Sequence, residues 1–337
     1  MAYYNYDRVM SYDALFNFIL SGRGNGKSYG AKEKAIKNFL KKGEQFIYVR
    51  RYKTELKKKH LFFDDIKDKF PNNKFEVKGN SAYIDGKLAG HFIALSTSQI
   101  EKSNAYPNVT LIIFDEFVVD KGHIRYLENE VEVFMDLYET VARLRELNGK
   151  KPVKALFLAN KVSIVNPYFI YFNCIPKNDE RFTVAKNGNI VIEMFTDKEF
   201  IEQKYQTRFG QLIKGTVYGD YAIENKSLRD NTEFVQPYKP SKSKFIFSIK
   251  FKGQEVGIWI SYKEGLAYVC DSIEQTSKYR FTITKDDHEL NYIMYTNLSE
   301  FIMFKQFVNY YKMGLARFKN VQIKQFMFEI MQYMSVR

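Results

Sequence analysis

The chain has 337 residues, of which 45% are hydrophobic and 17% aromatic, enough for two cores or for one large core with a smaller appendage. Lysine and arginine total 52 against 39 acidic residues, and the net charge of +13 favours a polyanionic partner, most simply nucleic acid. Two cysteines without metal-ligand spacing, no apolar run near the ~20 residues that cross a bilayer, and no signal-peptide pattern exclude a zinc, membrane or secreted protein. We therefore expect a soluble, intracellular protein.

The first predicted element is a buried strand at 15–20, which breaks into a glycine-rich turn and then a helix. The turn and helix start read SGRGNGKSY (21–29), the Walker A pattern of a phosphate-binding loop, with Ser21 where the pattern has its first glycine. Glycines let backbone N–H groups turn toward phosphate oxygens, and the helix N-terminus adds positive potential. Lys27 would reach the β- and γ-phosphates of a nucleoside triphosphate, and Ser28 would ligate Mg²⁺. The expected nucleotide contacts are Gly22, Arg23, Gly24, Asn25, Gly26, Lys27, Ser28 and Tyr29.

Elements that alternate between helix and strand follow the loop. Apolar spacing predicts a helix at 32–41 that stops at Gly43, and an apolar run predicts a buried strand at 46–49. That strand ends in a burst of positive charge, and a lysine-dense helix is predicted at about 54–70. Short strands are predicted next, at 75–77, 83–84 and 92–95.

The stretch VTLIIFDEF at 109–117 holds a second motif. Its apolar run lacks alternation, which suits a strand buried on both faces of a mostly parallel sheet. The strand ends in Asp115 and Glu116, the Walker B pattern: Asp115 would hold Mg²⁺, and Glu116 would polarise the attacking water as general base. This arrangement is typical of P-loop ATPases with an additional strand and a catalytic glutamate. The alternative is that the two acids simply end a buried strand in water.

A helix and a further strand complete the predicted ATPase region. The helix spans 130–147, with Arg143 and Arg145 at its end, and a strand at 153–160 terminates in Asn160. Asn160 would be a sensor that meets the γ-phosphate, or else an ordinary turn residue. Either arginine could reach the γ-phosphate of a neighbouring subunit, although an arginine there more often complements the helix dipole.

The remainder of the chain predicts a linker and a smaller α+β domain. A hairpin is predicted at 180–195 and helices from 196 to about 222, and Pro237 and Pro240 mark a plausible boundary. Three alternating strands, a fourth strand and two helices at about 297–315 and 320–334 then suit an RNase H-like layout. The first of these strands carries Ser248 and lysines but no acid, so an active nuclease is not expected. The predicted domains are an ATPase at 1–195, a helical linker at 196–227 and the nuclease-like domain at 228–337.

Several strings of this sequence resemble the genome-packaging ATPases of small salasvirus-like podophages. The resemblance is specific from near the N-terminus to about residue 220 and rests on layout beyond it. The strings are SYD (11–13), RGNGKSY (23–29), GEQFIYVRRYK (43–53), YIDGKLAG (83–90), EKSNAYPNV (101–109), FDEF (114–117), VNPYF (165–169) and TRFG (207–210).

The resemblance implies a ring ATPase that uses ATP and Mg²⁺ to translocate double-stranded DNA into a procapsid. It also implies a pentameric homo-oligomer in the host cytoplasm, anchored at the portal vertex through a phage structural RNA, with portal and capsid proteins as partners and no membrane. By position, the resemblance makes Arg143 the arginine that acts in trans, on the nucleotide of a neighbouring subunit. Lys53 and Lys102 fall at the subunit interface near the nucleotide, where the alternative for both is a solvated or DNA-backbone lysine.

Other functions remain open from the residues themselves. A terminase-like motor with a live nuclease would need more carboxylates than Asp271, Asp286 and Asp287 supply. A small-molecule kinase or GTPase would leave the net charge of +13 unexplained. A nucleic-acid-binding scaffold that only senses ATP would keep its function if Glu116 were replaced by glutamine. The basic run 57–59 is a candidate pore-facing surface, with a solvated helix face as the simpler interpretation.

Overall fold

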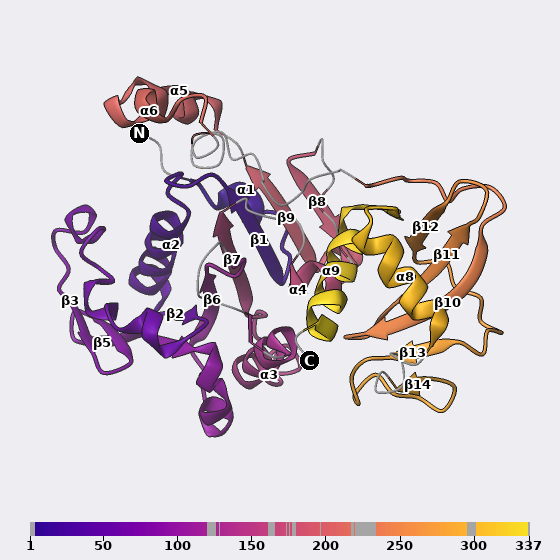
Figure 1. The fold of residues 1–337 in the computed structure, drawn as a ribbon. Coiled ribbons are helices and arrows are strands. Elements are labelled where there is room, and N and C mark those ends of the chain that lie inside the picture. Colours follow the sequence, from indigo (N-terminus) through magenta and orange to yellow (C-terminus); the bar gives the residue numbers. More distant parts are fainter. Residues whose placement is uncertain are drawn as a thin grey trace. The chain divides into compact units, whose positions relative to one another are not determined.

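The computed structural model describes residues 4–119, 126–127, 129–160, 166–172, 174, 176, 180–195, 197–216, 219, 234–294 and 301–335. The chain forms two compact units (Figure 1). The first unit comprises Met1–Ser163 and Cys174–Leu228, and the second comprises Ile164–Asn173 and Arg229–Arg337. The residues of the predicted linker therefore group with the first unit.

A nine-stranded sheet forms the centre of the first unit. Its strands are β1 Phe16–Ser21, β2 Gln45–Arg50, β3 Phe75–Lys78, β4 Ser81–Ile84, β5 Lys87–Ala94, β6 Val109–Asp115, β7 Lys154–Asn160, β8 Phe182–Ala185 and β9 Ile190–Phe195. The order is β3-β4-β5-β2-β6-β7-β1-β9-β8, and neighbours from β5 to β9 run parallel. β7 lies between β1 and β6, the strands of the two Walker motifs. The mostly parallel sheet and its additional strand are thus confirmed.

Two helices, α2 (Lys27–Lys42) and α3 (Glu130–Ala142), cover the parallel strands. Ile113 of β6 belongs to the core cluster that includes Ile36 of α2. Its neighbour Phe114 stacks instead on Phe134 of α3, with ring centroids 5.8 Å apart, and Phe157 of β7 packs 4.7 Å from the same ring. Because successive residues of a strand point to opposite faces, α2 and α3 lie on opposite faces of the sheet.

Short helices and turns connect these elements. The predicted hairpin is confirmed, since β8 and β9 pair antiparallel around a turn in which Asn187 has a φ of 54°. The helices predicted from 196 onward are confirmed for the described residues as α5 and α6 (Figure 1). The bounds are α1 Asp7–Met10, η1 Lys53–Leu56, η2 Lys59–Leu61, η3 Lys67–Lys69, η4 Leu95–Ser103, η5 Lys186–Gly188, α5 Lys198–Gln206 and α6 Arg208–Ile213.

Two predicted helices differ from those observed. The helix predicted at 54–70 is wrong: the segment forms the separate 3₁₀ turns η1, η2 and η3. Its backbone N–H groups bond mostly to carbonyls three residues back, as from Phe62 to Lys59 and from Ile66 to Phe63, so the turns are tighter than those of an α-helix. The helix predicted at 130–147 ends earlier, at Ala142, because Arg143 has a φ of 43°.

The second unit is built on a six-stranded sheet with the order β14-β13-β10-β11-β12-β15. The predicted antiparallel meander is confirmed in β10, β11 and β12. Phe307 of α8 and Phe326 of α9 pack against Phe247 and Phe251 of β10, so both helices cover the apolar face of this sheet. Among the described residues, no helix is long and apolar enough to span a bilayer. The bounds are α4 Pro167–Tyr171, β10 Lys244–Phe251, β11 Gln254–Ser261, β12 Leu266–Cys270, β13 Arg280–Thr282, β14 Ile293–Met294, α8 Ile302–Lys312, β15 Ala316–Phe318 and α9 Val321–Ser335.

Candidate nucleotide-binding site

The glycine-rich turn between β1 and α2 has the backbone that a phosphate-binding loop requires. Gly24 has a φ of 90° and Gly26 a φ of 75°, values that favour glycine because a Cβ atom would clash. Gly26 is also the N-cap of α2, so the next backbone N–H groups stand at a helix N-terminus. Arg23 at the tip of the turn is exposed, whereas Gly22 and Asn25 are buried. The turn can therefore hold an anion with its backbone N–H groups.

Lys27 is buried at the first position of α2 and points toward the start of the loop. Its Nζ donates to Ser21 Oγ at 2.9 Å, to the Gly22 carbonyl at 3.0 Å and to Asn160 Oδ1 at 3.4 Å. Serine at the position of the usual first glycine thus supplies an acceptor for this lysine. Burial lowers the pKa of Lys27 to about 8, against the opposing effect of Asp115 and with a smaller contribution from the charge of Lys204.

Ser28 and Asp115 bring the two Walker motifs together. Ser28 Oγ donates to Asp115 Oδ1 at 3.1 Å, and Tyr48 of β2 donates to Asp115 Oδ2 at 2.7 Å. Burial, and then the charge of Asp115, raise the pKa of Tyr48 well above its usual value, so this hydroxyl stays a donor. A serine hydroxyl beside an oriented carboxylate offers the hard oxygen ligands that Mg²⁺ prefers, so these two residues fit that ion.

Glu116 follows β6 with a φ of 60°, in the left-handed region that non-glycine residues rarely adopt. Its side chain is 56% exposed, and Oε2 accepts from Arg50 Nη2 at 2.6 Å. The same nitrogen donates to Glu55 Oε1 at 2.7 Å. Arg50 and Tyr48 were not among the site residues predicted from the sequence. The sequence held part of the signal for Arg50, because the strand predicted at 46–49 ends in positive charge. In a parallel sheet that end lies at the same edge as the end of the Walker B strand.

The N-terminal segment also touches the loop. The Tyr4 N–H donates to the Asn25 carbonyl at 3.3 Å, and the Tyr6 hydroxyl donates to the Lys27 carbonyl at 2.8 Å. A Cβ on Gly30 would lie 2.5 Å from the Tyr4 carbonyl oxygen, so this close approach requires glycine in α2. Tyr29 packs partly buried against the α2 core. The segment thereby fixes the loop from the side of α2.

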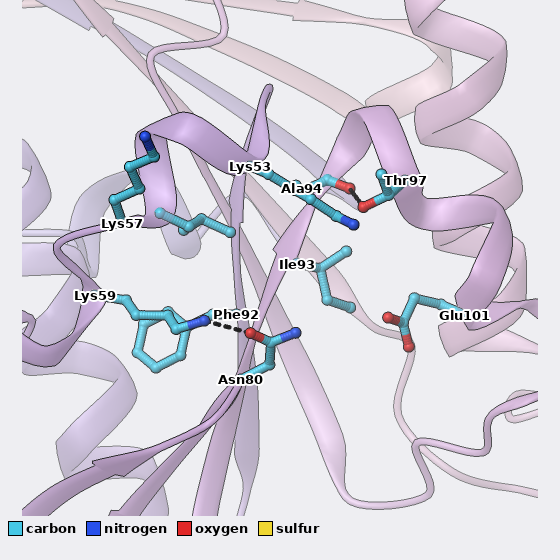
Figure 2. Close-up of a pocket in the computed structure, with 10 residues that line it drawn as sticks. Lys53, Lys57, Lys59, Asn80, Phe92, Ile93, Ala94, Thr97 and Glu101 are labelled. Carbon is cyan, nitrogen blue, oxygen red and sulfur yellow. Dashed lines mark hydrogen bonds between the residues drawn. The ribbon is translucent and has the colours of Figure 1, made fainter.

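The three residues expected at a subunit interface lie elsewhere: Lys53 on η1, Lys102 on η4 and Arg143 directly after α3. Arg143 Nη2 donates to the Asn104 carbonyl at 2.6 Å, and Lys102 pairs with Asp136 at 2.9 Å. Lys53 lines a cavity of about 380 Å³. Figure 2 shows its side chain among the others that line this cavity. The other residues of that cavity are Leu56, Lys57, Lys59, Asn80, Phe92, Ile93, Ala94, Thr97 and Glu101.

Carboxylates of the second unit make structural contacts. Asp287 accepts from the backbone N–H groups of Lys252 and Gly253 at 2.8 and 2.7 Å. Asp271 pairs with Lys319 at 2.7 Å. Within the described ranges, no group of three or more histidine, cysteine, aspartate or glutamate side chains could hold a metal ion.

The fold and the site define a P-loop protein of the additional-strand class, with Walker A on β1–α2 and Walker B on β6. The chain belongs to the Podovirus DNA encapsidation protein (Gp16) family, whose model matches residues 1–336. It is 42% identical over 329 residues to a DNA packaging protein of Bacillus phage B103, covering 98% of this chain and 100% of the relative.

Solved structures that are similar to this chain include two from bacteriophage phi29. The viral genome packaging motor assembly of bacteriophage Phi-29 contains a chain 39% identical, with a TM-score of 0.80 over 99% of this chain and 100% of that one. The N-terminal domain of the DNA packaging ATPase from bacteriophage phi29 is 48% identical, with a TM-score of 0.53 over 57% of this chain and 96% of that one.

Proposed function

We propose that this chain hydrolyses ATP to drive double-stranded viral DNA into a preformed procapsid. The observation that carries this proposal is the convergence of Lys27, Ser28 and Asn160 with Asp115 at the edge where β1, β6 and β7 end. The relationship to a DNA packaging ATPase of phi29 supports the choice of nucleotide and of cargo. The net charge of +13 suits a protein that grips the phosphate backbone, the part of DNA that every sequence shares.

The residues of the loop take distinct roles in this proposal. Backbone N–H groups from Gly22 to Ser28 hold the phosphates, and Lys27 places an ammonium group on the outer ones. Ser28 and Asp115 would hold Mg²⁺, which would offset charge that develops on the phosphates. Asn160 donates to the γ-phosphate through its amide nitrogen, since its oxygen faces Lys27.

Glu116 is the general base of the reaction. Its exposed carboxylate follows the Walker B strand directly and accepts a proton from the attacking water. Arg50 holds that carboxylate through a charged hydrogen bond, so the base acts fully only when the contact with Arg50 loosens.

Arg143 would act on the nucleotide of a neighbouring subunit, with Lys53 and Lys102 at the same interface. Arg143 donates to the Asn104 carbonyl and Lys102 pairs with Asp136, both of them residues outside the Walker motifs, and Lys53 lines a cavity beside β5. We propose that the protein works as a ring, with a pentamer as the family expectation, on the procapsid portal vertex in the host cytoplasm. Its proposed partners there are the portal and capsid proteins and a phage structural RNA.

The test is ATP hydrolysis by purified wild type, Glu116→Gln and Arg143→Ala, with and without duplex DNA. The proposal predicts that DNA stimulates the wild type, that both variants fail, and that small fractions of either variant poison mixtures with wild type. Hydrolysis that ignores DNA, with Arg143→Ala behaving as wild type, would contradict it and favour an ATP-sensing scaffold.

A further inference from the structure

Helix α5 lies against the tip of the phosphate-binding loop, far along the chain from α2. An ideal Cβ on Gly24 would lie 3.1 Å from Phe200 Cζ and 3.5 Å from Lys204 Nζ. The Lys204 ammonium group also donates to the Arg23 carbonyl. Phe200 and Lys204 are four residues apart, so they share one face of the helix, and that face meets the loop.

The position of the Lys204 ammonium group is set by its own helix. Its Nζ lies 4.7 Å from the centre of the Phe200 ring, a cation–π contact. The Asp197 carboxylate caps α5 by accepting from the Phe200 N–H at 3.1 Å. The cap and the ring together hold the lysine over the loop.

Positive charge accumulates at this end of the loop. Burial and then the charge of Arg23 lower the pKa of Lys204, so its ammonium group stands close to a second cation at the tip of the loop. An anion that binds beside two neighbouring cations offsets their repulsion.

We propose that Lys204 is a nucleotide-binding residue that contacts the outer phosphates of ATP from the tip of the loop, opposite Lys27. The inference rests on the proposed ATPase function and adds a residue from outside both Walker motifs. A polyphosphate is a stronger acceptor than the Arg23 carbonyl that Lys204 now contacts, because the acceptor is charged. Binding of ATP would thereby draw α5 onto the nucleotide.

The experiment measures dissociation constants for fluorescently labelled ATP and ADP, and for AMP by competition. All proteins carry Glu116→Gln, so that ATP is not consumed. The added variants are Lys204→Met, Lys204→Arg and the matched control Lys214→Met. Lys214 is an exposed lysine at the end of α6, and its Nζ lies over the ring of Tyr205.

We expect Lys204→Met to weaken ATP binding about tenfold, with a smaller loss for ADP and none for AMP, because the lost attraction scales with phosphate charge. Lys204→Arg should stay within about threefold of the parent, and Lys214→Met should match it. Equal losses for all three nucleotides would show that α5 only supports the loop, and unchanged ATP binding would show no contact; either result overturns the proposal. Hydrolysis by the otherwise wild-type protein is followed separately, so failure of the ATPase function is distinguished from failure of the Lys204 contact.

Discussion

Arg50 Nη2 lies 2.6 Å from Glu116 Oε2, and the same nitrogen lies 2.7 Å from Glu55 Oε1. One guanidinium therefore joins the proposed general base to η1, the turn that also carries Lys53. Asp115 lies 3.8 Å from Nη1 of the same group. Arg50 is thus placed to transmit a movement of η1 to Glu116.

Arg50→Gln should release Glu116. We expect hydrolysis without DNA to rise several-fold and its stimulation by DNA to fall, because the base is no longer held by an ion pair. Steady-state phosphate release with and without duplex DNA measures both. The matched control is Lys78→Gln, which breaks the 2.7 Å pair with Glu76 elsewhere in the first unit. Unchanged basal and stimulated rates in Arg50→Gln, or the same rise in the control, would refute this role.

Tyr48→Phe should weaken the response to magnesium. The variant removes the 2.7 Å hydrogen bond to Asp115 and leaves the aromatic ring in the core. Loss of a partner behind a metal ligand costs about 10- to 100-fold in metal affinity. We expect the Mg²⁺ concentration for half-maximal hydrolysis to rise about tenfold. Tyr138→Phe, which loses only a bond to the Val153 carbonyl, should leave that concentration unchanged.

Lys27→Met should stabilise the fold while it abolishes nucleotide binding. The folded pKa of Lys27, about 8, lies below the usual 10.5 of lysine, so the unfolded chain binds more protons between these values and stability rises with pH there. Below pH 8 the buried lysine is charged in the folded wild type and lowers its free energy of unfolding by roughly 3 kcal/mol, the energy equivalent of the pKa shift. Urea unfolding at pH 7 should therefore favour the variant, and the advantage should shrink toward pH 10. A variant less stable than wild type at pH 7 would count against a charged, buried lysine.

Arg51 and Glu130 form a pair that is almost fully buried, with the Arg51 Nε 2.6 Å from Glu130 Oε2. Arg51→Met leaves a buried carboxylate behind, so we expect a loss of about 3–5 kcal/mol in the free energy of unfolding. Denaturant titration checks this value. Lys74→Met, which removes one member of an exposed pair with Glu76, should change that free energy little. A loss in Arg51→Met no larger than in the control would contradict the assignment.

Local patterns were enough to predict the Walker strands, the loop and the meander. Loop glycines, the unbroken apolar run before Asp115 and the alternation in β10–β12 are each set by neighbours a few residues away. The additional strand followed from the class that these motifs indicate. The segment at 54–70 was mispredicted because its lysine-dense sequence is compatible with an α-helix, whereas its backbone N–H groups bond mostly to carbonyls three residues back, in separate 3₁₀ turns.

Residues that reach the site from other elements escaped prediction for a different reason. Tyr48 and Arg50 meet Asp115 and Glu116 only because β2 pairs with β6 in register. Lys204 meets the loop only through the packing of α5 on Gly24. Such contacts depend on strand order and helix placement, and local sequence patterns do not show either of them.

If ATP hydrolysis that depends on Glu116 drives packaging, procapsids supplied with this protein and ATP should take up DNA and protect it from DNase. We expect protected DNA with wild type, none with Glu116→Gln, and a loss of protected DNA steeper than linear as the variant is mixed into wild type. Equal amounts of protected DNA with Glu116→Gln and with wild type would show that hydrolysis at this site does not drive packaging.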